Sequence, residues 1–199
     1  MFKVLSRFLL LSLVLILSFL DLKAQVVTVS PSFPTESSAI VITFDAKEGN
    51  GGMSGFAGVV YAHTGVITNN STSNTDWKYT KGTWGTANAP VLTGIGNDKY
   101  TLSISDIRAY YGVPSGESIE KIAILFRNEA GNISGRNADG SDIFIQLYSG
   151  GLYATIASPS QNKIYSIGES ITINGGSSMS ATLAVNINGT DVASNVGTS

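Results

Sequence analysis

The sequence predicts an all-β protein made of antiparallel β-sandwiches, and three observations support this fold class. Apolar and polar residues alternate with a period of two in several short runs, while no helical period is sustained. Each run is bounded by Gly, Asn, Asp or Pro, the residues that turn a chain. Glycine is abundant, at 22 residues, and only 13% of the residues are charged. Such a composition is typical of a turn-rich extracellular sandwich.

The first 24 residues predict a secretory signal peptide. Lys3 and Arg7 precede the apolar run Phe8–Leu20, and Ala24 supplies a small residue before the expected cut. The run is short for a membrane span, although a retained N-terminal anchor is the alternative. We therefore expect a secreted or cell-surface protein that has no membrane contact after cleavage. The chain has no cysteine, so we expect neither disulfides nor anchoring through a lipid-modified cysteine.

Residues 25–149 are expected to form the first β-sandwich. Four runs place alternate apolar side chains on one face: Ile40, Ile42 and Phe44; Tyr100, Leu102 and Ile104; Ile122, Ile124 and Phe126; and Ile143, Ile145 and Leu147. A helical turn is predicted over Ser105–Gly112, where Asp106 would cap the first turn and Pro114 would limit the helix.

Residues 150–199 are expected to form an incomplete immunoglobulin-like β-sandwich that starts after a boundary at Ser149–Gly151. Strand patterns over Tyr153–Pro159, Ile164–Ile173 and Ala181–Ile187 resemble the opening strands of such a domain. A complete domain needs about 100 residues, and fewer than half of these follow the boundary. The chain is thus expected to be a fragment of a longer protein, the alternative being a short protein with a loose tail.

Charge and composition give no support to several classes of function. The net charge of −2 provides no electrostatic reason to bind nucleic acid or an anionic membrane. A single histidine and no cysteine leave little for Ser-His or Cys-His catalysis. The sequence has no Gly-rich phosphate loop and no clustered metal ligands, so we expect no cofactor and no catalytic residue in this segment.

The segment Asn137–Asp142 has two further interpretations. Asp139 and Asp142 supply closely spaced oxygen atoms that could suit calcium, or two carboxylates that could act in glycoside hydrolysis. The segment lacks the closing glutamate of a calcium loop, and a turn offers no cleft for a substrate. A polar hairpin turn is the preferred interpretation, and no metal site is expected.

The residues between Val59 and Gly85 carry the clearest indication of function. Tyr61 and His63 are two positions apart, so they point to the same side of a strand. Trp77 and Trp84 follow among Asn, Ser, Thr and Gly rather than among the aliphatic residues that surround buried aromatic rings. This pattern predicts a surface aromatic platform for a sugar. In the alternative interpretation, the tryptophans anchor a loop in the core and His63 contacts no ligand.

Several strings in this region and beyond it resemble one kind of protein module: Val60–Gly65, Asp76–Tyr79, Lys81–Trp84, Asp106–Pro114, Leu125–Asn128 and Gly135–Phe144. They resemble the N-terminal module of secreted α-amylase-type glycoside hydrolases from Bacteroidetes, and are similar to starch-binding carbohydrate-binding modules of families 25 and 26. The resemblance covers roughly residues 26–148. It implies that Tyr61 and His63 present a strand pair and that Trp77 completes the platform. Trp84 has no clear counterpart, and Lys81 is expected to add hydrogen bonds.

The resemblance implies that a monomer binds starch-like α-glucan without catalysis. It also implies that the module tethers a glycoside hydrolase family 13 domain, absent from these residues, within an α-amylase-type parent enzyme. Contacts with two or three glucose units predict weak affinity, with a dissociation constant on the order of 0.01–1 mM. The alternative function is that of a structural or adhesive extracellular β-sandwich that binds no sugar.

Overall fold

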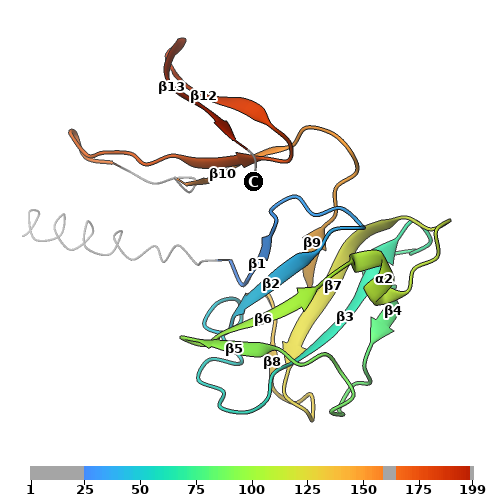
Figure 1. Cartoon of the computed structure of the whole chain (residues 1–199). Coiled ribbons are helices and arrows are strands. Elements are labelled where there is room, and N and C mark those ends of the chain that lie inside the picture. The colour runs from blue at the N-terminus through green and yellow to red at the C-terminus, as the bar shows by residue number, and fades with distance from the viewer. Residues whose placement is uncertain (1–24, 159–164, 198–199) are drawn as a thin grey trace, which may run out of the picture.

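The structure, a computed structural model, describes residues 25–158 and 165–197 (Figure 1). The predicted signal peptide, residues 1–24, lies outside the described residues, as does part of the predicted second unit, residues 159–164. Apart from a single short helix, the regular secondary structure of the described chain consists of strands in antiparallel sheets, which confirms the predicted all-β class. Within the same residues, no helix has the length and apolar character needed to cross a membrane.

Two antiparallel sheets form the sandwich, and Figure 1 shows them as two layers. The first sheet has the strand order β1 (Val27–Ser30), β2 (Ile40–Asp45), β6 (Lys99–Ile104) and β5 (Thr93–Gly96). The second has the order β4 (Lys78–Lys81), β3 (Tyr61–Thr68), β7 (Ile119–Arg127) and β8 (Ser134–Gly135), and β7 also pairs with β9 (Ile143–Gln146). The predicted boundary near Ser149 therefore follows the last strand of the sandwich.

The core lies between the two sheets and confirms the predicted inward faces. Phe44 of β2 stacks on Phe126 of β7 with ring centroids 3.9 Å apart, and both side chains are fully buried. Tyr100 packs against this core while partly exposed. The other residues of the four predicted apolar faces are all buried, namely Ile40, Ile42, Leu102, Ile104, Ile122, Ile124, Ile143, Ile145 and Leu147. In a chain without cysteine, this apolar burial is the main stabilising term.

The predicted helical turn is confirmed as α2 (Ile107–Tyr111). The Asp106 side chain caps it by accepting a hydrogen bond of 2.7 Å from the backbone N–H of Ala109. Gly112 ends the helix in the left-handed conformation, at φ 77°, which glycine adopts without the strain of a Cβ atom. The hydroxyl oxygens of Tyr111 and Thr64 lie 2.6 Å apart, and this hydrogen bond attaches α2 to β3.

The C-terminal region contains two two-stranded ladders. β10 (Ala154–Ser158) pairs with β11 (Asn174–Ser177), and β12 (Ala181–Ile187) pairs with β13 (Thr190–Gly197). The predicted strand over Ile164–Ile173 is wrong for its described part, because residues 165–173 form a turn and irregular structure. The turn has a local cause: Gly168 has φ 86°, and the Glu169 carboxylate accepts a hydrogen bond from the backbone N–H of Ser166.

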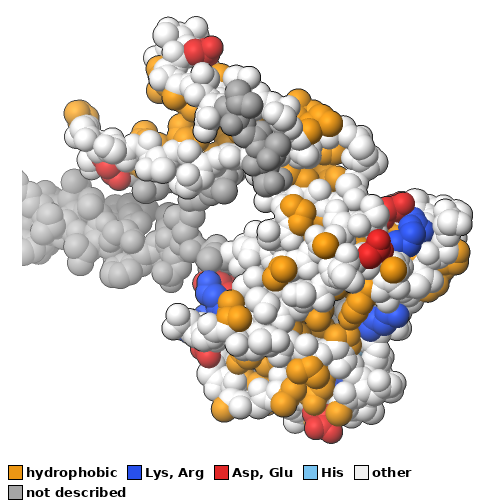
Figure 2. All heavy atoms as spheres, in the orientation of Figure 1, with side chains coloured by type: hydrophobic (Ala, Val, Ile, Leu, Met, Phe, Trp, Pro, Cys, Tyr) orange, Lys and Arg blue, Asp and Glu red, His pale blue; other side chains and the backbone are white. Residues whose placement is uncertain are grey.

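Charged side chains are sparse on the surface of the sandwich. On the face drawn in Figure 2, basic and acidic side chains are scattered and no single basic or acidic patch is seen. This distribution is in keeping with the net charge of −2.

Candidate functional site

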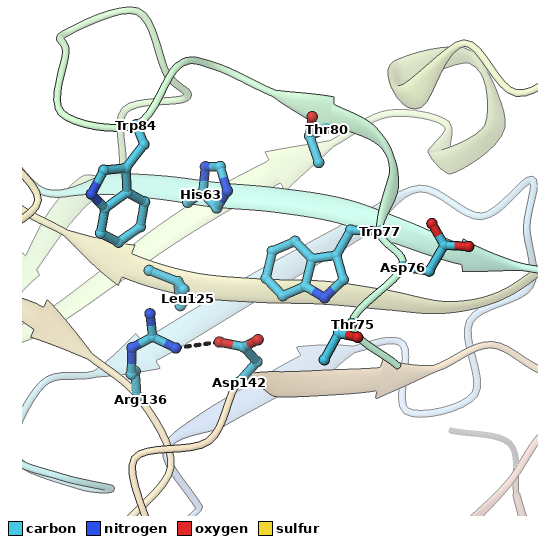
Figure 3. A pocket seen from close by; sticks show the side chains of 9 residues that line it. All are labelled: His63, Thr75, Asp76, Trp77, Thr80, Trp84, Leu125, Arg136 and Asp142. Carbon is cyan, nitrogen blue, oxygen red and sulfur yellow. Dashed lines mark hydrogen bonds and ion pairs between the residues drawn. The ribbon is translucent and has the colours of Figure 1, made fainter. Parts of the chain in front are cut away.

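An open groove lies on the outer face of the second sheet and has a volume of about 570 Å³. Figure 3 shows the two tryptophans and the histidine along one side, with the ion pair between Arg136 and Asp142 facing them. The residues that line it are His63, Thr75, Asp76, Trp77, Thr80, Trp84, Leu125, Arg136 and Asp142. They come from separate strands and loops, so the fold rather than local sequence assembles the groove.

Strand pairing determines why His63 reaches this groove. Along β3, Ala62 and Val66 point into the core, and the alternation of a strand therefore turns His63 to the outer face. In the ladder with β7, His63 lies directly opposite Leu125. The floor of the groove is thus apolar next to the imidazole.

The structure brings three of the predicted aromatic residues together. The imidazole of His63 stacks near the indole of Trp77, with centroids 5.7 Å apart and planes 27° apart. Trp84 meets the imidazole edge-on, at 5.2 Å and 89°. Trp84 is 44% exposed and Trp77 is half-buried, and neither belongs to the buried core cluster. The interpretation of the tryptophans as core residues therefore does not describe this geometry.

Trp77 is held by the polar loop that precedes β4. Its indole N–H donates a hydrogen bond of 3.0 Å to the carbonyl of Asn74, so the ring faces rather than the N–H remain for other contacts. Asp76 braces the loop by accepting from the backbone N–H of Thr72 and by pairing with Lys78 at 2.8 Å. A Cβ atom on Gly65 would come within 2.9 Å of the Lys78 carbonyl oxygen, so glycine allows β4 to approach this closely.

Tyr61, predicted as part of the platform, lies outside the groove. Its side chain does point to the same side of β3 as His63, but it is only 7% exposed. The cause is Arg127, which pairs with Tyr61 in the ladder and places its guanidinium 5.5 Å from the centre of the phenol ring. Tyr61 instead lines a second hollow of about 440 Å³, next to Phe56 and Val59.

Lys81, expected to donate hydrogen bonds to a sugar, also lies outside the groove. Its ammonium is 5.7 Å from the ring centre of Tyr110 on α2. The pairing of β3 with β4 shifts register between Thr64 and Val66, and this places Lys81 opposite the inward-facing Thr64. Thr80 lines the groove instead.

Six groove residues were not predicted from the sequence as part of a sugar site, although Asp142 was considered as a calcium ligand or a catalytic carboxylate. Four of them lie within the strings that carry the family resemblance, which was the one available signal: Asp76, Leu125, Arg136 and Asp142. Thr75 and Thr80 have no sequence signal of their own. Strand register decides which of these side chains meet, and a single sequence does not specify it.

The charges in and around the groove are largely compensated. Burial, followed by the nearby Arg127 guanidinium, lowers the pKa of His63 below its usual value of 6.5, so the imidazole is neutral at pH 7. Arg136 pairs with Asp142, and Asp76 pairs with Lys78. The groove thus combines aromatic faces with hydrogen-bonding groups that carry little net charge.

The segment with Asp139 and Asp142 has the geometry of a hydrogen-bonded turn. The Asp139 carboxylate accepts from the backbone N–H of Ser141 at 2.9 Å, Gly140 has φ 81°, and Asp142 is held by Arg136. In residues 25–158 and 165–197, no group of three or more His, Cys, Asp or Glu side chains could hold a metal ion.

Comparisons with protein-family models and with curated proteins gave no match. The geometry and chemistry of the groove therefore carry the functional inference.

Proposed function

We propose that the groove binds a starch-like α-glucan and catalyses no reaction. The observation that carries the proposal is the alignment of the exposed Trp84, the neutral His63 and the half-buried Trp77 along one open groove. Glucose presents apolar C–H faces that stack on aromatic rings and hydroxyls that need polar partners. The groove supplies both kinds of group, as small-ligand sites generally do.

The relative orientation of the rings favours a curved glucan over a flat one. Trp77 lies at 27° to the imidazole while Trp84 lies at 89° to it, so the aromatic faces do not form one plane. A β-1,4-glucan is a flat ribbon whose successive units would need coplanar rings. An α-glucan turns from unit to unit, and can therefore meet rings of different orientation.

The polar rim suits a neutral polysaccharide. Arg136 and Asp142 lie on one wall, and Asp76 and Thr80 also line the groove (Figure 3). Hydrogen bonds that involve an ionised partner are stronger than those between neutral groups, so these side chains can orient sugar hydroxyls. Because the charges occur in opposite pairs, the groove offers no field that would favour a charged polymer.

The same pairs argue for binding rather than hydrolysis. A glycosidase needs one carboxyl group whose raised pKa keeps it protonated as the general acid. A hydrogen bond from Lys78 instead lowers the pKa of Asp76, and Asp142 is engaged by Arg136. We further propose, from the sequence resemblance, that the module belongs to a secreted α-amylase-type enzyme and keeps its family 13 catalytic domain near polymeric substrate.

Native gel electrophoresis of the chain without its predicted signal peptide tests the proposal. Soluble starch in the gel should retard the protein, whereas a soluble cellulose derivative should not. Trp84→Ala and Trp77→Ala should each reduce the retardation. Tyr110→Ala is the matched control, because Tyr110 is a partly exposed aromatic residue on α2 outside the groove. Unchanged mobility of the unmodified chain in starch would overturn the proposal and favour a structural or adhesive role.

A further inference from the structure

Arg127, at the end of β7, is a fully buried charged side chain. Removing a charge from water is unfavourable unless other groups compensate it. None of the ion pairs in the described part of the chain includes Arg127. Its compensation therefore comes from other contacts, and these contacts indicate its role.

The guanidinium joins two loops through four backbone carbonyls. Nη1 donates to the carbonyl oxygens of Asn128 at 2.9 Å and Glu129 at 2.8 Å. Nη2 donates to those of Thr83 at 2.9 Å and Thr86 at 3.0 Å. Thr83 and Thr86 flank Trp84, so one side chain fixes the loop that carries the exposed indole. Only arginine offers donors in a planar fork that can reach both loops at once.

Arg127 also contacts two aromatic rings directly. Its guanidinium carbon lies 5.5 Å from the ring centre of Tyr61 and 5.5 Å from that of Trp84. A cation over the face of an aromatic ring is attracted to it, and more strongly where water is excluded. Tyr61 belongs to β3 and is buried, whereas Trp84 is exposed. The contacts thus connect an exposed ring to a fixed part of the sheet.

We propose that Arg127 is a positioning residue that holds Trp84 in the orientation required to stack on the glucan, a role that rests on the proposed function. An exposed indole in a loop of Gly, Thr and Asn would otherwise lose rotamer freedom on binding. Fixing it beforehand removes that entropic penalty from the binding free energy. Arg127 is thus expected to influence affinity through Trp84, with no contact of its own to the sugar.

The two tryptophans of the chain make the proposal testable without a ligand. Trp77→Phe leaves Trp84 as the sole tryptophan, so its fluorescence anisotropy and its quenching by acrylamide report on that ring alone. In this background, Arg127→Lys and Arg127→Met should lower the anisotropy and raise the quenching constant of Trp84. Unchanged anisotropy and quenching in variants that remain folded by circular dichroism would overturn the proposal.

Binding measurements then test whether Arg127 acts through Trp84. Arg127→Met, which removes the charge, should weaken starch affinity by roughly 2- to 30-fold, the range expected for a lost cation–π contact. The same substitution should have no further effect in a Trp84→Ala background, because no ring remains to be positioned. An equal loss in both backgrounds would contradict the proposal.

A second variant keeps the test decisive if both Arg127 variants fail to fold. Tyr61→Leu removes one ring beneath the guanidinium but keeps an apolar side chain and the four carbonyl contacts. This variant should lower the anisotropy of Trp84 in the Trp77→Phe background. Unchanged anisotropy would overturn the role given to the contacts of Arg127 with the two aromatic rings. If the unmodified chain binds no starch, the proposed function fails, while the fluorescence still decides whether Arg127 positions Trp84.

Discussion

His63 and Trp77 stack with their ring centroids 5.7 Å apart and their planes 27° apart. The contact joins two parts of the chain with different rigidity, because His63 sits in the middle of a paired strand while Trp77 ends a polar loop. The orientation of Trp77 therefore depends on an imidazole whose protonation state is set by its surroundings. We therefore expect the geometry of the groove to respond to pH.

The pKa of His63 is expected to lie below 6.5 in the folded protein. Burial is the main cause, because it disfavours the charged imidazolium, and the positive charge of Arg127 adds to it. The chain has one histidine, so a proton NMR titration of the imidazole resonances measures this pKa without overlap. A midpoint at or above 6.5 would contradict the assigned environment.

The lowered pKa of His63 should make the folded protein less stable toward unfolding as the pH falls below 6.5. The unfolded chain takes up a proton on His63 near pH 6.5 and the folded chain only at lower pH. The contribution of the neutral imidazole is thus fully present above pH 6.5 and is lost as the pH falls through the folded pKa. Urea unfolding at pH 7.5 and 5.5 should show a smaller loss of stability for His63→Gln than for the unmodified chain, and equal losses would contradict the prediction.

Because Thr64 and Tyr111 share a hydrogen bond, substitutions of these two residues should have coupled effects on the free energy of unfolding. Thr64 donates its hydroxyl proton to the carbonyl of Ala123 at 2.8 Å, so Tyr111 is the donor in the 2.6 Å contact with Thr64. Thr64→Val would leave the buried Tyr111 hydroxyl without its partner and lower the free energy of unfolding by about 1–3 kcal/mol. Tyr111→Phe should cost less, about 0.5–1.5 kcal/mol, because Thr64 keeps its bond to Ala123.

A double-mutant cycle in urea checks this coupling. In the Tyr111→Phe background no hydroxyl remains to be orphaned, so Thr64→Val should then be milder than in the unmodified chain. Strict additivity of the two substitutions would show that the hydroxyls do not interact. Phe44→Ala serves as a reference for pure loss of packing between the sheets, expected at about 3–5 kcal/mol.

Local rules were sufficient for the sandwich but not for the groove. The period-two run that ends at Phe44 identified an inward face because a half-buried strand must alternate. Asp106 identified the helix start because capping acts within a single turn. Both rules involve residues that are close in sequence, so one sequence contains the whole signal.

The groove depends on the register in which the strands pair and on one buried charge, that of Arg127. Neither can be predicted from patterns of residues that are close in sequence. Tyr61 and His63 share a face as expected, yet their environments differ because Arg127 lies opposite one and Leu125 opposite the other. A register shift in the pairing of β3 with β4 separates Lys81 from the groove. Both features arise from pairing between strands, and the pairing of β3 with β7 joins residues that are distant in sequence.

The last prediction separates the groove in the structure from the site expected from the sequence. Arg136 and Lys81 are both basic and half-buried, but only Arg136 lines the groove. A hydrogen bond to a charged group contributes about 1.5 kcal/mol or more, which corresponds to at least roughly tenfold in affinity. Arg136→Gln should therefore weaken binding of a maltooligosaccharide by about tenfold in calorimetric titration. Lys81→Gln should leave the affinity within about twofold of that of the unmodified chain. If Lys81→Gln instead lost more affinity than Arg136→Gln, the sugar would have to bind at the edge of β4 beside Tyr110 rather than in the groove.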